Sequence, residues 1–287
     1  MSQFIFGNIS DIEAIISISA TIISGLFFLS KYFEGRRYKI KFSNLDSRTK
    51  KAIKCYIPTR AQITDPCDQD SDNNAASFEL LPFFLAEFKN SETQYFMILA
   101  DSGMGKTTFL LKLYFVYRKK IFKKYRVVFF SLSQPNVIKK IKKIKHKSRT
   151  ILLLDCLDED RNAMDDYSKR IQELCDVTKL FYKVIITCRT QFFPDSDSEP
   201  QETGRIKVGV GNKNIEFEKY YLSHFNNEEI DLYLNKKYTN FLNKKNVKKI
   251  TRSKELIDSC PRLMYRPMLL SYIDDLILDS GKIYICL

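Results

Sequence analysis

One short stretch constrains the fold of this chain more than any other: Ala100-Asp101-Ser102-Gly103-Met104-Gly105-Lys106-Thr107-Thr108. It follows an apolar run, YFMILA (95–100), and precedes a segment long enough for a helix, TTFLLKLYFVYRKKIF (107–122). The pattern GxxxxGK[ST] between a strand and a helix is typical of a phosphate-binding loop, and here only its first glycine is replaced, by Ala100. The sequence therefore predicts a strand, a phosphate loop and a helix in this order.

The residues of this loop have distinct expected roles, and all of them are candidate nucleotide contacts. Gly103 and Gly105 let the backbone curl so that its N–H groups surround a β-phosphate at the positive end of the following helix. Lys106 is expected to reach the β- and γ-phosphates, and the Thr107 hydroxyl is expected to bind Mg²⁺. Thr108 is expected near the α-phosphate. ATP or ADP with Mg²⁺ is therefore the predicted ligand.

Short apolar runs recur along the chain and alternate with segments long enough for helices. This alternation indicates a parallel sheet covered by helices on both faces, an α/β fold. The run 51–63 contains a strand-like stretch closed by Pro58, the polar and acidic residues 65–77 predict a loop, and helical periods from about residue 226 predict a smaller helical subdomain. The expected strands are 95–100, 126–132, 150–155, 183–188 and 216–222, and a further helix is expected over 164–181.

The strand expected at 150–155 ends in a carboxylate, Asp155, as a magnesium-binding strand of a phosphate-loop ATPase does. Asp155 is therefore predicted to hold Mg²⁺, directly or through water. Three or four residues further on, Asp158 or Glu159 can orient a water beside the γ-phosphate, and Glu159 is the first choice for the general base. Asp160 has a simpler interpretation as an acidic residue at a helix N-terminus, where the helix dipole stabilises it.

One further strand lies along the chain between the phosphate-loop strand and the strand that ends in Asp155. This order favours the additional-strand, AAA-like ATPases over the kinases and GTPases. The next strand ends in Thr187, Cys188 and Arg189. Its polar tip would face the γ-phosphate if that strand lies between the other two, so Arg189 joins the candidate catalytic residues.

Four stretches in this order resemble the NACHT-type STAND ATPases, especially bacterial ones: ADSGMGKTTFL, ILLLDCLDED, VIITCRTQFF and RPMLLSYIDDL. The resemblance runs from about residue 50 to the end. It implies an ADP-bound resting state that exchanges to ATP and forms homo-oligomers after a C-terminal sensor detects a trigger. It also implies slow, switch-like hydrolysis and a signalling role in bacterial antiviral defence. By the same resemblance, Arg189 is the sensor-1 arginine, Pro267 packs near the adenine, and CYIPTR (55–60) lines the base.

Two departures from the family pattern affect this prediction. His224 stands where these proteins usually carry proline, so the turn at 222–225 is expected to differ. The sequence stops at Leu287, just inside the helical domain, before the winged-helix domain and the sensor that the resemblance implies. A truncated product that binds nucleotide without completing the switch is therefore an alternative expectation.

Residues 14–30, AIISISATIISGLFFLS, carry no charge and lie at the lower limit of length for a helix that crosses a hydrocarbon core of about 30 Å. Acidic residues precede this segment and basic residues follow it, unlike in a cleaved signal peptide. The positive-inside rule then places the ATPase domain of a single-pass membrane protein in the cytoplasm. An ordinary buried helix is the alternative. The expected parts are an anchor at 1–35, a nucleotide-binding domain at 36–225 and a partial helical domain at 226–287.

Positive charge is concentrated in the middle of the chain. Lys and Arg number 47 against 34 Asp and Glu, a formal net charge of +13, and no acidic residue lies between Ser102 and Leu154. Residues 137–147, VIKKIKKIKHK, predict an amphipathic helix with a solvated cationic face. Contact of this face with anionic lipid is the better functional alternative. Nucleic acid is a less favoured partner, because no recognition motif accompanies the lysines.

The cysteines and histidines give no sign of a second cofactor. The seven cysteines are scattered without a CxxC pair, and the chain has two histidines, which argues against a disulfide scaffold and a zinc site. Two other functions stay open beside the switch: a membrane-associated phosphate-loop ATPase that acts on nucleic acid, and a nucleotide-binding remnant or scaffold without activity. Steady ATP turnover stimulated by DNA or RNA would favour the first of these two.

Overall fold

A computed structural model of the chain describes residues 38–64, 77–90, 92–192, 205–208, 215–239, 246–260 and 265–280. The chain divides into two units, Met1–Lys41 and Phe42–Leu287, and every described helix and strand belongs to the second. The segment predicted to cross a membrane, 14–30, lies outside the described residues. Among the residues that are described, no helix is both long and apolar enough to span a bilayer.

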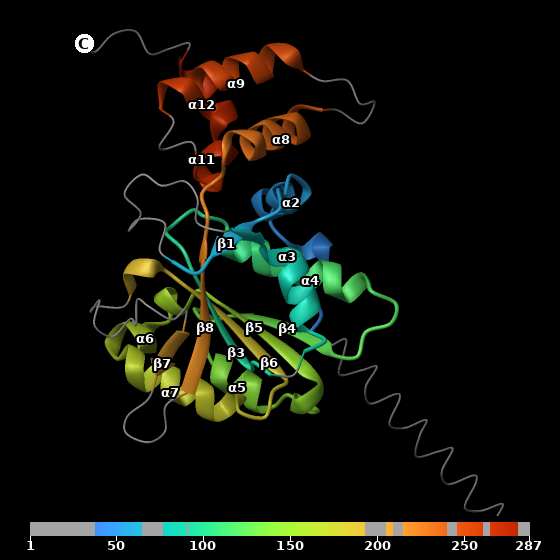
Figure 1. Ribbon diagram of the computed structural model, residues 1–287, viewed down its shortest axis with the longest axis vertical. Helices are drawn as coiled ribbons and strands as arrows, with labels where there is room; N and C mark the ends of the chain where they lie inside the picture. Colours follow the sequence, from blue (N-terminus) through green and yellow to red (C-terminus); the bar gives the residue numbers. More distant parts are fainter. Residues whose placement is uncertain are drawn as a thin grey trace, which may run out of the picture. The chain divides into compact units, whose positions relative to one another are not determined.

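An eight-stranded sheet forms the centre of the described second unit (Figure 1). Its strands are β1 (Arg60–Gln62), β2 (Phe78–Glu79), β3 (Tyr95–Leu99), β4 (Arg126–Ser131), β5 (Thr150–Asp155), β6 (Lys183–Cys188), β7 (Arg205–Val208) and β8 (Ile215–Leu222). They lie in the order β2-β1-β8-β3-β6-β5-β4, and β7 pairs with β8 outside that path. The five strands from β8 to β4 are parallel and match the five predicted runs. The predicted parallel sheet is confirmed for these five strands, and at the other edge β1, β2 and β7 add antiparallel pairs that the sequence did not predict.

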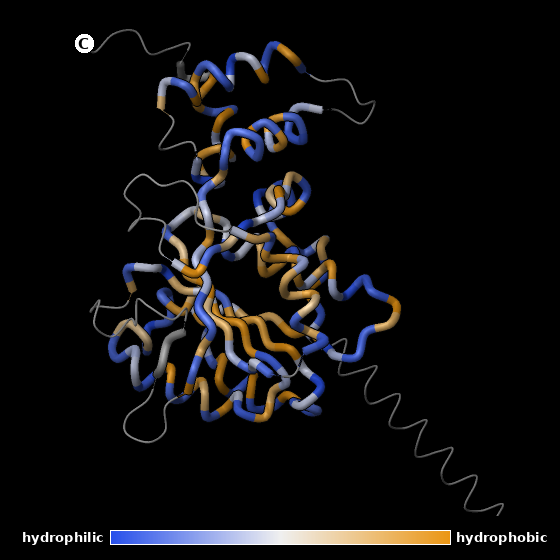
Figure 2. Tube along the Cα trace, viewed as in Figure 1, coloured by the Kyte–Doolittle hydropathy of each residue, from blue (hydrophilic) through white to orange (hydrophobic). Residues whose placement is uncertain are grey.

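Helices cover both faces of the sheet, as predicted. They are α3 (Leu80–Glu87) and α4 (Lys106–Lys119) on one face, and α5 (Val137–Lys142), α6 (Arg161–Asp165) and α7 (Tyr167–Thr178) on the other (Figure 1). Successive side chains of a strand point to opposite faces. On β3, the Phe96 ring therefore packs 5.2 Å from the Phe84 ring of α3, while the Tyr95 hydroxyl reaches the Cys175 carbonyl of α7 at 3.4 Å. Every residue of β3, β5 and β6 is buried, and Figure 2 shows these strands as hydrophobic.

Two predicted helices are shorter than expected. The helix expected over 107–122 ends at Lys119, so that Ile121 and Phe122 lie in the loop that follows it. The amphipathic helix expected over 137–147 ends at Lys142, although its apolar stripe is buried as predicted. The helix α4 ends soon after its last buried apolar position, Tyr117, and a helix gains most of its stability from packing an apolar face. Beyond α5, Ile144 is buried although it lies outside the helix.

Two other segments differ from the prediction in kind. The single helix expected over 164–181 is two helices, because Asp166 is extended and caps α7 by accepting a hydrogen bond from the Lys169 N–H at 2.9 Å. The strand-like stretch closed by Pro58 begins instead with the end of a helix, α2 (Ser47–Lys54), continues without regular structure, and the strand β1 begins only at Arg60. Proline lacks the N–H that a ladder needs, so here it precedes the strand.

Four described helices follow β8, in the part of the chain where helical periods predict a helical subdomain. They are α8 (Asn227–Tyr238), α9 (Val247–Ser259), α11 (Pro267–Ser271) and α12 (Ile273–Ser280). Their buried side chains form one cluster that includes Leu234, Ile257 and Leu270. Ile57, which precedes β1, belongs to the same cluster. The segment between α2 and β1 therefore packs against the helical subdomain.

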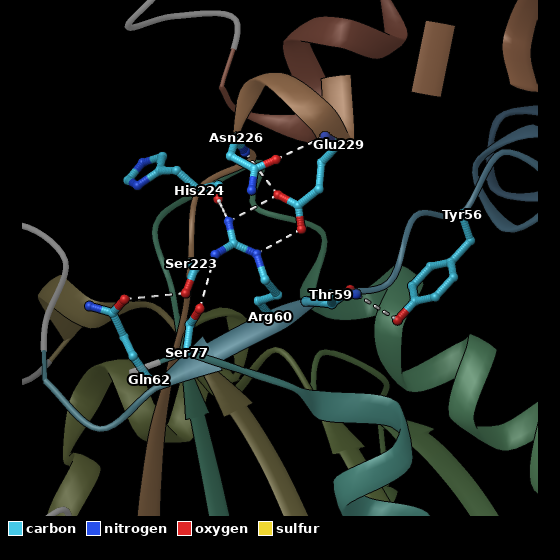
Figure 3. A network of polar contacts seen from close by, with 9 residues as sticks. All are labelled: Tyr56, Thr59, Arg60, Gln62, Ser77, Ser223, His224, Asn226 and Glu229. Atoms are coloured by element: carbon cyan, nitrogen blue, oxygen red, sulfur yellow. Dashed lines mark hydrogen bonds and ion pairs between the residues drawn. The ribbon is translucent and has the colours of Figure 1, made fainter. Parts of the chain in front are cut away.

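Arg60 on β1 joins the sheet to the start of α8 (Figure 3). Its guanidinium donates to both carboxylate oxygens of Glu229, at 2.8 and 3.0 Å, and to the His224 carbonyl at 3.1 Å. Glu229 in turn accepts from the Asn226 N–H, and the Asn226 side chain accepts from the Glu229 N–H, which makes a capping box. Arg60 thus fixes the turn at His224, where the sequence departs from the family it resembles.

Replacing Glu229 with alanine removes the ion pair and half of the capping box, and it leaves the Arg60 guanidinium without its carboxylate. We expect the free energy of unfolding, measured by urea titration, to fall by about 2–4 kcal/mol. The matched control is Glu228→Ala, since Glu228 is exposed in the same helical turn. We expect the control to change the free energy of unfolding by less than about 0.5 kcal/mol. Equal losses from the two variants would contradict a special role for the Arg60 pair.

Candidate functional site

The predicted phosphate loop lies at the carboxyl end of β3 and leads directly into α4. Gly103 and Gly105 have φ angles of 81° and 90°, a region in which a side chain is strained. Ala100 is not among the described residues with positive φ, and its N–H bonds to the Cys188 carbonyl of β6 at 3.3 Å. The alanine at the first loop position therefore carries no backbone strain, because the chain is still extended there.

Lys106 is the first residue of α4 and is only 9% exposed. Its ammonium group donates to the backbone carbonyls of Ala100 and Asp101, so it points into the loop. Burial lowers the pKa of Lys106, and the nearby negative charge of Asp158 opposes that shift. A buried ammonium inside a ring of backbone groups is suited to bind phosphate oxygens, which would replace the two carbonyls as partners.

The strand β6 lies between β3 and β5, which brings three strand ends together. Thr187, near the end of β6, donates its hydroxyl hydrogen bond to Asp155 Oδ1 at 2.7 Å and accepts one from the Cys156 N–H at 3.0 Å. Asp155 is 2% exposed, and this bond orients its carboxylate. The condition set by the sequence is met, because β6 separates β3 from β5, and the sheet with its flanking helices has a P-loop NTPase fold.

The structure brings together Asp158, Glu159 and Arg189, the three residues predicted to do chemistry. Arg189 Nε lies 2.7 Å from Asp158 Oδ2. Asp158 is 8% exposed, and among the described residues its other oxygen, Oδ1, is a buried atom without a hydrogen-bond partner. Glu159 is exposed to the cavity beside them. Asp158 is therefore held in an ion pair with Arg189, while the exposed carboxylate of Glu159 can accept a hydrogen bond from a water molecule.

Asp160 does not belong to this group. It caps α6 by accepting from the Asn162 N–H at 3.1 Å, and its Oδ2 atom also binds the Arg170 guanidinium at 2.7 Å. The interpretation of Asp160 as a residue at a helix N-terminus is therefore confirmed.

A cavity of about 510 Å³ extends from the phosphate loop to the helical subdomain. The stretch predicted to line a base does border it, through Cys55, Tyr56, Ile57 and Thr59, although this stretch is not a strand. Arg60, the last residue of CYIPTR, points instead to Glu229. Sequence reasoning missed the residues that α2, α8 and α12 contribute, because no motif marks them: Arg48, Thr49, Lys51, Ala52, Tyr233 and Asp275.

The helix α11 closes one side of the cavity. The Met268 N–H donates to the Gly103 carbonyl at 3.0 Å, and Arg266 forms an ion pair with Asp101 at 3.1 Å. Pro267 and Met268 line the same cavity as the phosphate loop, and the role of Pro267 beside the adenine stays a prediction. A Cβ atom at Gly103 would lie 2.9 Å from Met268 Cβ. The missing side chain of Gly103 is therefore what lets α11 approach.

The groups that would hold Mg²⁺ are hard oxygen donors near the phosphate loop. Thr107 Oγ1 lies 3.9 Å from Cys156 Sγ, next to the end of β5 where Asp155 lies. Magnesium in such sites is bound by one or two carboxylates together with substrate phosphates and water. Thr107 and Asp155 fit this donor set. Within the described ranges, no group of three His, Cys, Asp or Glu side chains is placed to hold a metal ion.

No protein-family model and no curated protein sequence matches this chain. Among solved structures, it is similar to AMPPCP-bound DnaA from Aquifex aeolicus, with 17% identity, a TM-score of 0.34, and coverage of 62% of this chain and 60% of that one. Domain III of Thermotoga maritima DnaA matches at 14% identity and a TM-score of 0.42, with coverage of 70% and 83%. The Thermotoga maritima RuvB branch migration motor matches at 9% identity and a TM-score of 0.31, with coverage of 71% of this chain and 66% of that one. The chain thus spans 60% of the length of the Aquifex protein.

The approach of α11 to Gly103 predicts different effects for alanine at the two loop glycines. Both Gly103→Ala and Gly105→Ala place a side chain at positive φ, and this strain destabilises each variant by about 1–2 kcal/mol. Only the Gly103 variant also collides with Met268, because nothing lies within 4 Å of a Cβ atom at Gly105. We expect hydrogen exchange at the Met268 amide to accelerate at least severalfold in Gly103→Ala and to change little in Gly105→Ala. The same rate in both variants would show that α11 does not depend on this approach.

Proposed function

We propose that this protein is a nucleotide-binding switch of the NACHT-type STAND class, which binds ADP or ATP with Mg²⁺ and hydrolyses ATP slowly. The observation that carries the proposal is the contact of α11 with the phosphate loop, made by the Met268–Gly103 hydrogen bond and the Arg266–Asp101 ion pair. A nucleotide in the cavity would touch the loop and α11 together. Its binding would then favour one arrangement of the sheet and the helical subdomain over another.

The end of the cavity near Arg189 is where ATP and ADP would differ. Arg189 is bound to Asp158, and its side chain is 50% exposed, so a γ-phosphate could compete for the guanidinium. The buried oxygen of Asp158, which has no hydrogen-bond partner among the described residues, is a further acceptor at this end of the cavity. An exchange of this ion pair would give ATP a contact that ADP lacks, and a ligand shifts a conformational equilibrium only by such a difference.

Glu159 is the residue we assign to orient the attacking water. It is exposed at the rim of the cavity, and its neighbour Asp158 is held by Arg189. A general base must lie within hydrogen-bond reach of the water that it activates, and a positioned base contributes about 10²–10⁴-fold to the rate. Glu159 is the carboxylate best placed to move toward such a water.

Lys106→Ala tests the binding step, and Glu159→Gln is its matched partner. Loss of the lysine removes charge-assisted hydrogen bonds to phosphates, worth roughly 1.5–3 kcal/mol, so ATP and ADP should bind the purified chain about 10- to 100-fold more weakly. Glu159→Gln should bind ATP as the wild type does and release phosphate at least about 100-fold more slowly. Nucleotide titration and phosphate release measure both effects. Unchanged ATP affinity in Lys106→Ala would reject the proposed site.

We further propose that the switch is anchored in a membrane through residues 14–30, with its ATPase domain in the cytoplasm. The support is the uncharged segment itself and the basic residues that follow it, Lys31, Arg36, Arg37, Lys39 and Lys41. Homo-oligomers on activation and a role in bacterial antiviral defence are proposed from the family resemblance. Clustering of several anchors in one oligomer would couple nucleotide exchange to the membrane.

Deletion of residues 14–30 tests the anchor. We expect the full chain to stay with membranes during alkaline extraction, because a spanning helix resists it, and we expect the deletion variant to be released. The matched control is deletion of residues 66–75 from the polar loop, which should leave the chain in the membrane pellet. Retention of the 14–30 deletion variant to the same extent would remove the basis for an anchor.

A further inference from the structure

The loop that joins α4 to β4 carries two apolar side chains that are almost fully exposed. Ile121 is 88% exposed and Phe122 is 96% exposed, and no other large apolar side chain among the described residues is as exposed as either. Figure 1 shows this loop projecting from the body, and Figure 2 shows a hydrophobic tip between hydrophilic flanks. Exposed apolar side chains that adjoin each other in this way commonly mark an interaction site.

Lysines surround this apolar tip on both sides. Lys119 and Lys120 precede it, Lys123 and Lys124 follow it, and all four are exposed. The Lys123 ammonium donates to the Arg118 carbonyl at 3.0 Å and so ties the two arms of the loop together. The acid-free stretch from Ser102 to Leu154 means that no carboxylate of this part of the chain neutralises them.

The base of the loop is fixed and adjoins further positive charge. The Tyr125 ring stacks on Tyr182 with centroids 3.7 Å apart, and Arg126 donates to the Lys145 carbonyl at 2.7 Å. The turn before β5 therefore lies beside the loop, and its exposed cations extend the basic surface: Lys143, Lys145 and Arg149. Two acidic residues are described shortly before β3, at this end of the sheet. Glu92 is exposed, whereas Glu87 forms an ion pair with Lys183 at 3.4 Å.

We propose that the loop 119–124 docks this protein on an anionic lipid surface, with Ile121 and Phe122 inserted at the level of the headgroups. An apolar tip gains free energy only by leaving water, and the flanking lysines can keep their ammonium groups at the phosphate level while the tip enters. The opposite charges of the loop and of anionic lipid attract within a Debye length of the bilayer. A nucleic acid would satisfy the lysines and the Phe122 ring, but it offers no apolar medium to Ile121.

The position of the loop leaves the nucleotide cavity open. The loop precedes β4 and lies at the amino ends of the parallel strands, whereas the phosphate loop and Asp155 lie at their carboxyl ends. Docking would therefore occur on the opposite end of the sheet from the cavity. Docking of this loop on lipid does not require nucleotide in the cavity, because none of the residues that would contact the lipid line that cavity.

A tryptophan reporter can test insertion at this site, because the chain contains no tryptophan. Phe122→Trp is introduced into the full chain, and its fluorescence is followed with vesicles of phosphatidylcholine alone or mixed with phosphatidylserine. We expect a blue shift and protection from an aqueous quencher only with the mixed vesicles. The matched control is Leu232→Trp on α8, where the native side chain is 51% exposed and no lysine-ringed loop is present. We expect no shift there.

Charge variants in the Phe122→Trp background test the role of the lysines. Each lysine near an anionic surface contributes about fivefold to the apparent affinity, so Lys119→Gln with Lys120→Gln should weaken the apparent affinity for the mixed vesicles by roughly 25-fold. The paired control is Lys139→Gln with Lys142→Gln on the exposed side of α5, which should leave it nearly unchanged, with thermal unfolding confirming that all variants fold. The proposal is overturned by no shift with the mixed vesicles, by equal shifts at both tryptophan positions, or by a single-stranded oligonucleotide that protects the reporter better than the vesicles do.

Discussion

The insertion of β6 between β3 and β5 is the constraint on which the rest of the site depends. Parallel strands place their carboxyl ends at one edge, so this order puts the phosphate loop, Thr187 and Asp155 side by side. The Thr187 hydroxyl then bonds Asp155 Oδ1 and also the Cys156 N–H. Arg189, directly beyond β6, is thereby within reach of Asp158. Asp155 and Asp158 are thus each held by a residue of the neighbouring strand β6 or directly after it.

A second pair of contacts connects this edge to the helical subdomain, and the two contacts differ in character. Arg60 and Glu229 form a bidentate, partly buried ion pair that also completes a helix cap, so breaking it leaves charge without a partner. The contact of Met268 with Gly103 is a single backbone hydrogen bond at a position without a side chain. The first contact is suited to be a fixed pivot and the second to open and close.

The sequence predicted the parallel strands and the phosphate loop closely, and it failed where local capping or an edge decided the structure. Continuous apolar runs such as ILLLD are a strong signal because strands buried on both faces contain little else. Asp166, by contrast, sits in a segment whose apolar period continues on both sides, and only its cap of α7 splits the helix. The run before Pro58 is helical because Asp46 caps α2 and Ile53 is buried. The antiparallel strands β1, β2 and β7 are too short to show an alternation of apolar and polar residues in the sequence.

The sequence by itself determined which side chains are candidates to bind phosphate and magnesium: the loop glycines, Lys106, Asp155 and the acidic pair after it. Their types and spacing are local, and the chemistry of phosphate and magnesium demands them. Only the tertiary structure decided how they are partnered, because the contacts of Arg60 with Glu229, Arg189 with Asp158 and Met268 with Gly103 join residues far apart in the sequence. It also decided that Ile121 and Phe122 stay in water, since a helix ends where the sheet no longer covers its apolar face.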